Sequence, residues 1–109
     1  MNFNKILEIA DGDQNFINLI TKENIKLYEE FKGSYSIAMK NGDLPHLKFI
    51  NHRTTSSIQL LEIFELGVKI KEGQNLISKK RQDQKLIDKN IEDVNQLCKK
   101  VINELRKKI

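Results

Sequence analysis

Apolar residues recur every three or four positions through most of the chain, the spacing that places them on one face of an α-helix. The first such stretch is short, with apolar positions at Phe3, Ile6, Leu7 and Ala10. The second predicts a long helix from Phe16 to Lys40, whose stripe consists of Phe16, Ile17, Ile20, Leu27, Tyr28, Phe31, Tyr35 and Ala38. Lysine and glutamate fill exposed positions between them, so both helices are expected to be amphipathic.

Turn-forming residues separate these helices. Asp-Gly-Asp stands at positions 11–13 and Asn-Gly-Asp at positions 41–43, and glycine suits the left-handed conformation that often ends a helix. Asp13 and Asp43 are good N-caps for the helices that follow them. Pro45 then falls in the first turn of a third helix, where its missing N–H costs nothing.

The stretch after Glu62 fits two patterns. It alternates as a half-buried β-strand would, with apolar residues at Phe64, Leu66, Val68 and Ile70. It also fits a helical stripe, through Leu66, Ile70 and Leu76 or Ile77. Gly67 and Gly73 weaken the helical pattern. We nevertheless expect a helix, because a lone strand in an otherwise helical chain would have no partner.

A polar connector from Lys79 to Gln84 precedes the last predicted helix. That helix has a regular apolar stripe at Ile87, Ile91, Val94, Cys98, Val101 and Leu105. Cys98 is therefore expected to be a buried core thiol rather than a nucleophile. As the only cysteine, it also excludes an internal disulfide.

Four substantial helices joined by short loops, after one short helix, predict an all-α fold. The expected architecture is an antiparallel up-down four-helix bundle with a short additional N-terminal helix. At 109 residues, the chain suits a single domain spanning residues 1–109. It has no apolar run near the roughly 20 residues that span a bilayer and no secretory signal. We therefore expect a cytoplasmic protein with no membrane partner.

Charge and composition limit the remaining function classes. The net charge is +4 and is unevenly distributed. Residues 79–109 contain ten Lys or Arg and five Asp or Glu, whereas residues 1–78 contain nine Lys or Arg and ten Asp or Glu. This basic end is either a surface for an acidic partner or nucleic acid, or a solvated helix face. The acidic residues interleaved with it favour the solvated face. The sequence has no metal-ligand spacing, no Ser-His-Asp set and no glycine-rich phosphate loop, so neither a metal site nor an enzyme is expected.

The third helix places one histidine in a setting typical of a site. Because each residue turns a helix by about 100°, His52 shares its face with Lys48, Thr55, Ser56 and Gln59. The opposite face is suited to a core and consists of Leu47, Ile50, Thr54, Ser57, Ile58 and Leu61. His52 is therefore predicted to point outward, within reach of another protein. His46, in the first turn, is expected to be a surface residue without a role.

The order of these features resembles the histidine-containing phosphotransfer (HPt) domain of bacterial multistep phosphorelays. That family has a Gly-Asp turn, a long helix, and an aspartate that opens the next helix before the active histidine; here these are Gly12-Asp13, Phe16 to Lys40, Asp43 and His52. The resemblance covers nearly the whole chain. It departs from the family after the histidine, since Thr55 stands where the family carries a lysine and Ser56 replaces a glycine.

The resemblance implies that His52 is a phosphoacceptor, which shuttles a phosphoryl group between receiver-domain aspartates in two-component signal transduction without kinase activity of its own. The partners would be a response-regulator receiver domain, a hybrid histidine kinase, or both. No cofactor is expected on this domain, because in the family the Mg²⁺ belongs to the receiver. The alternative is a degenerate HPt-like module that binds a receiver or kinase without phosphotransfer.

Supporting roles follow for the neighbours of His52. Lys48 and Arg53 are candidate substitutes for the missing lysine. Thr55, Ser56 and Gln59 would hold the imidazole or bind phosphoryl oxygens. An apolar docking rim for the receiver would consist of Phe49, Leu60 and Ile63, which flank the His52 face by the same angular count. These three could instead pack against neighbouring helices, and for Leu60 we expect packing.

Overall fold

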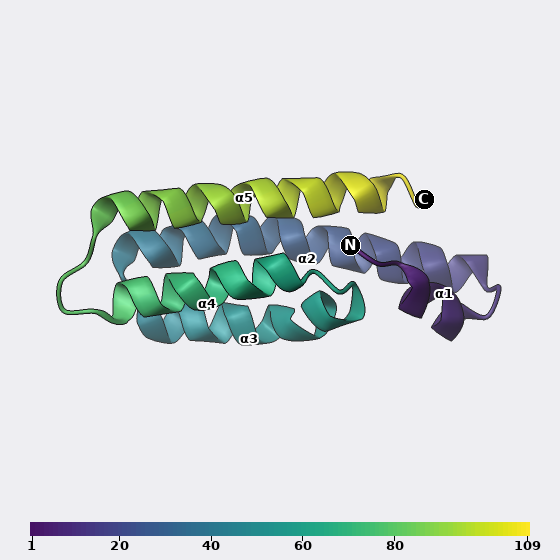
Figure 1. Ribbon diagram of the computed structural model, residues 1–109. Helices are drawn as coiled ribbons and strands as arrows, with labels where there is room; N and C mark the ends of the chain where they lie inside the picture. Colours follow the sequence, from purple (N-terminus) through teal and green to yellow (C-terminus); the bar gives the residue numbers. More distant parts are fainter.

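The computed structural model describes all residues from 1 to 109 and contains five α-helices and no β-strand (Figure 1). The helices are α1 (Asn4–Ala10), α2 (Gln14–Asn41), α3 (Leu44–Leu60), α4 (Phe64–Ser78) and α5 (Gln84–Arg106). The all-α prediction is confirmed, and the ambiguous stretch after Glu62 is helical, as expected.

The predicted caps form where the sequence places them. Asp13 accepts a hydrogen bond from the backbone N–H of Phe16 at 3.1 Å, and Asp43 accepts one from the N–H of His46 at 3.1 Å. Gly42 ends α2 in the left-handed conformation, with φ of 61°. Each cap satisfies backbone groups that a helix end leaves unpaired, so the loops around α2 and α3 are fixed locally.

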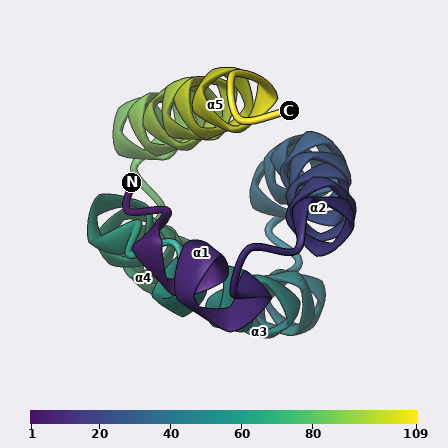
Figure 2. The ribbon, with the colours of Figure 1, turned by 90° about the vertical axis from the view of Figure 1, so that its right-hand side faces the viewer.

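The four longer helices lie side by side around a common core (Figure 1). Contacts link α2 with α3, α3 with α4, α4 with α5, and α5 with α2. Seen from the end, these four helices surround the core, and α1 is drawn in front of α3 and α4 (Figure 2). The result is an elongated molecule of 51 × 20 × 19 Å, and none of its helices is long and apolar enough to cross a lipid bilayer.

One hydrophobic cluster of 25 buried residues fills the space between the helices. It includes every predicted stripe residue of α5, and both Leu76 and Ile77 of α4. The prediction was less accurate at the edges. Leu7 of α1 is 48 % exposed, and Phe16 and Ile20 of α2 are only partly buried, because α1 and the first turns of α2 extend past the ends of the other helices (Figure 1).

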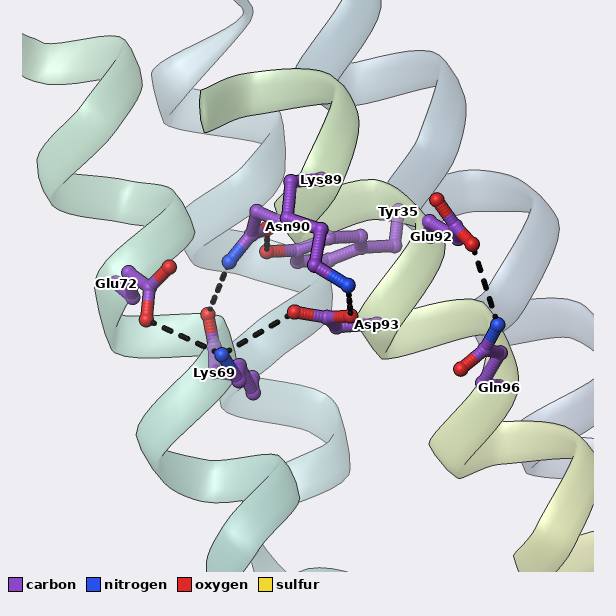
Figure 3. Close-up of polar contacts among 8 residues, drawn as sticks. All are labelled: Tyr35, Lys69, Glu72, Lys89, Asn90, Glu92, Asp93 and Gln96. Atoms are coloured by element: carbon purple, nitrogen blue, oxygen red, sulfur yellow. Dashed lines mark hydrogen bonds and ion pairs between the residues drawn. The ribbon is translucent and has the colours of Figure 1, made fainter. Parts of the chain in front are cut away.

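A buried polar network fixes α4 against α2 and α5 (Figure 3). The Tyr35 hydroxyl of α2 donates to Asn90 Oδ1 of α5 at 2.5 Å, and Asn90 Nδ2 donates to the backbone carbonyl of Lys69 at 2.8 Å. Gly73 of α4 leaves room for the tyrosine, because a Cβ there would lie 2.0 Å from its hydroxyl oxygen. Near the surface, Asp93 pairs with Lys69 at 3.2 Å and Lys89 at 2.9 Å. The bond from Asn90 to the Lys69 carbonyl sets the position of α4 along α5, and the Tyr35 hydroxyl fixes Asn90.

Candidate functional site

His52 lies on the outer side of α3 and is exposed to solvent. The residues predicted for the opposite face are all buried: Leu47, Ile50, Thr54, Ser57, Ile58 and Leu61. The two polar residues on this inner face are satisfied, since Thr54 donates to the carbonyl of Ile50 at 2.9 Å and Ser57 donates to Asn24 of α2. The packing of α3 therefore holds the imidazole outward.

A surface groove of about 630 Å³ runs beside His52, between α3 and α4. Its α3 wall consists of Lys48, Asn51, His52, Thr55, Ile58 and Gln59. Its α4 wall consists of Phe64, Gly67, Val68, Ile70, Lys71 and Gln74. The groove brings together three residues predicted to support His52, namely Lys48, Thr55 and Gln59, with residues of a second helix.

Two amide side chains join the two walls. Asn51, only 4 % exposed, donates from Nδ2 to Gln74 Oε1 at 2.7 Å, while its Oδ1 has no hydrogen-bond partner. Thr55 donates its hydroxyl proton to the backbone carbonyl of Asn51 at 3.0 Å. The groove wall is thus anchored at Asn51, and the Thr55 hydroxyl is already bonded within its own helix.

Two lysines line the groove without an acidic partner. Lys48 precedes His52 by one turn of α3, and Lys71 comes from α4; neither forms any of the ion pairs in the structure. Sequence reasoning missed Lys71 and Gln74. Their spacing marks them only as polar positions of α4, and nothing in the sequence states which helix faces His52.

Two predicted supporting residues lie outside the groove. Ser56 is exposed on α3 but does not line it. The guanidinium of Arg53 lies 5.8 Å from the centre of the Phe49 ring, and Arg53 borders a depression on the α2 side of α3, with Leu27 and Glu30. The structure therefore does not bring Arg53 to the groove, because its position about 100° around the helix directs it to the α2 side.

The structure corrects the predicted docking rim at Ile63, which is buried, at 7 % exposure. Leu60 is partly buried against the core, which is the packing expected for it. The angular count fails for Ile63 because α3 ends at Leu60 and Glu62 adopts a positive φ of 53°, which turns the chain before α4. Phe49 is exposed as predicted, at 58 %. The apolar surface on the groove itself comes from Phe64 and Val68, each 63 % exposed.

Other chemistry-bearing groups lie elsewhere or are occupied. Cys98 is fully buried, and burial raises the pKa of its thiol to about 12, so it is mostly protonated near neutral pH. No cluster of three or more His, Cys, Asp or Glu side chains is arranged to hold a metal ion. Part of the basic charge of α5 is paired, for example Lys89 with Asp93 at 2.9 Å and Arg106 with Glu29 at 2.6 Å.

Comparison with known proteins adds no family assignment. No family model, no curated protein and no solved structure matches this chain. Its function is therefore inferred from the groove and from the sequence pattern around His52. Together these offer one exposed imidazole, two unpaired ammonium groups and an adjoining apolar strip.

Proposed function

We propose that His52 is a reversible phosphoacceptor and that the protein carries a phosphoryl group between receiver-domain aspartates in a phosphorelay. The observation that supports this proposal is an imidazole held outward by a buried helix face, beside a groove with two unpaired cations. A phosphoacceptor that serves partner proteins must be reachable from outside, and His52 is.

The chemistry requires little beyond this exposure. A neutral imidazole is a competent nucleophile toward phosphorus. Its free ring nitrogen would attack the phosphorus of an aspartyl phosphate on the partner. The acyl O–P bond breaks, the aspartate leaves as carboxylate, and the other ring nitrogen releases its proton to solvent. Transfer depends mainly on positioning and charge stabilisation, and the HPt resemblance assigns the Mg²⁺ to the receiver.

The proposal includes the topology expected for this class of domain. We infer an antiparallel up-down four-helix bundle, formed by α2 to α5, with α1 as an addition. Each of these helices contacts the next along the chain, and α5 returns to α2. The connections between them are short, which favours such neighbours.

The direct test uses a receiver domain carrying a labelled phosphoryl group. After mixing, the wild-type protein should acquire label that is acid-labile and alkali-stable, as expected for phosphohistidine, and His52→Gln should acquire none. His46→Gln is the matched control, because His46 is also exposed on α3 and lies outside the groove. Label that persists in His52→Gln would exclude His52 as the acceptor.

The structure also supports the alternative of a binding module without phosphotransfer. Thr55, which replaces the family's lysine, is neutral, and its hydroxyl is bonded to Asn51. If this alternative holds, the protein binds a receiver or kinase, His52→Ala binds equally well, and no label appears on either protein. A binding measurement on the same samples therefore distinguishes the two functions.

A further inference from the structure

We propose that Lys71 of α4 supplies the positive charge that stabilises a phosphoryl group on His52. This inference rests on the proposed function, and it names the residue that takes the place of the missing lysine at Thr55. The cation comes from the neighbouring helix rather than from the helix of the histidine.

The groove places the two residues on facing walls. His52 lies on the α3 wall and Lys71 on the α4 wall of the same groove. Thr55 also lines it, but it carries no charge, and its hydroxyl donates within α3. A phosphoryl group on His52 would bring about two negative charges into this groove. The nearest compensation that α3 offers within the groove is Lys48, and Lys71 adds a second cation from the opposite side.

Lys71 has no acidic partner, whereas Lys69 on the same helix has two. Lys69 lies two residues earlier and pairs with Asp93 at 3.2 Å and with Glu72 at 3.6 Å (Figure 3). Lys71 forms no ion pair and is exposed. The charge of one lysine of α4 is thus compensated by two carboxylates, while the other lines the groove of His52 with its charge uncompensated.

The surroundings of Lys71 fix its place in the groove. Phe64 and Val68 precede it by seven and three residues and line the same groove wall, so the three side chains share one face of α4. The buried network of Tyr35 and Asn90 fixes α4 (Figure 3), so the backbone of Lys71 belongs to a helix with a fixed position.

A small phosphoryl donor tests this role without a protein partner. With phosphoramidate, a ring nitrogen of His52 attacks phosphorus, the P–N bond breaks, ammonia leaves, and the ring releases a proton. We expect Lys71→Gln to slow this reaction by about three- to fivefold, the effect of losing one partly screened charge contact. Lys71→Arg should keep most of the rate. Adding Thr55→Lys to Lys71→Gln should restore it, because the charge returns on α3.

Lys69→Gln is the matched control, since it removes the same charge from the same helix but outside the groove. Its phosphorylation rate should stay within about twofold of wild type, because a screened charge facing away contributes little. The inference is overturned if Lys71→Gln reacts as fast as wild type, or if Lys69→Gln is slowed equally. Urea unfolding of each variant shows whether the helices remain folded.

A second measurement separates this inference from the proposed function. Inorganic phosphate is titrated into the unmodified protein while the ring resonances of His52 are followed by NMR. Phosphate should shift them at several-fold lower concentration in wild type and Lys69→Gln than in Lys71→Gln. Equal responses in wild type and Lys71→Gln would refute the role of Lys71 even if His52 accepts phosphate. Conversely, failure of every donor to label His52 would refute phosphotransfer but leave the phosphate result standing.

Discussion

Gly73→Ala should destabilise the protein far more than a helical glycine-to-alanine change normally would. An added Cβ would lie 2.0 Å from the Tyr35 hydroxyl oxygen and 2.8 Å from Asn90 Oδ1. Both atoms belong to one buried hydrogen bond of 2.5 Å, and Asn90 is also tied to the backbone of Lys69 at 2.8 Å. Neither side chain can retreat without breaking a bond inside the core.

The magnitude follows from three contributions. Leaving a buried hydrogen-bonding group unpaired costs about 1–3 kcal/mol, and overpacking a dense core costs about 1–3 kcal/mol. Alanine regains about 1 kcal/mol of helix propensity over glycine. The net loss for Gly73→Ala is therefore about 1–5 kcal/mol. In a chain of this length, the middle of that range lowers the Tm by roughly 10 °C.

Urea and thermal unfolding followed by far-UV circular dichroism measure this loss. Gly33→Ala is the matched control, because Gly33 also lies inside a helix but an added Cβ there meets nothing within 4 Å. It should stabilise the protein by about 0.5–1 kcal/mol. The cost of Gly73→Ala should also shrink in a Tyr35→Phe background, where the hydroxyl is gone. A Gly73→Ala protein as stable as wild type would show that α4 does not pack as described.

Two further predictions concern titratable groups. A hydrogen bond from Lys89, and a weaker contribution from Lys69, lower the pKa of Asp93 below its ordinary 3.8. The folded state therefore binds fewer protons at Asp93 than the unfolded state does. The resulting stabilisation is present above pH 3.8 and is lost as the pH falls through the lowered pKa. Asp93→Asn should therefore reduce the loss of stability on acidification, measured by urea unfolding at about pH 6 and about pH 3; an unchanged loss would contradict it. Because burial raises the Cys98 pKa to about 12, the thiol should react with a disulfide reagent only in urea, and rapid reaction of the native protein would show that α5 is not closed over it.

The helices could be predicted from the sequence because their signals are local. The aspartate caps at Asp13 and Asp43 and the glycine at Gly42 act within one turn of chain. The stripe of α5 repeats regularly enough to place Cys98 in the core, where the structure has it fully buried. The outward direction of His52 follows from the same rule, since the apolar residues of α3 determine the remaining face.

The groove could not be predicted, since it depends on how two helices are placed against each other. Lys71 and Gln74 are ordinary polar positions until α4 is docked beside α3. Counting about 100° per residue correctly groups Lys48 and Gln59 with His52, but the rule holds only to the end of α3. The left-handed conformation of Glu62 changes the direction of the chain, so the count does not apply to Ile63. A residue on the next helix cannot be related to His52 by counting along the chain.

Helix α4 was the least certain element in the sequence, and the reason lies in its packing. Gly73 lowers helix propensity, yet it is required there because Tyr35 occupies the space of a side chain. The alternation of Phe64, Leu66, Val68 and Ile70 resembles a strand because α4 carries apolar residues on two faces. Leu66 and Ile70 are buried, whereas Phe64 and Val68 are exposed along the groove. The features that make this helix hard to predict therefore belong to its two faces. Gly73, Leu66 and Ile70 serve packing, and Phe64 and Val68 would contact a partner that binds in the groove of His52.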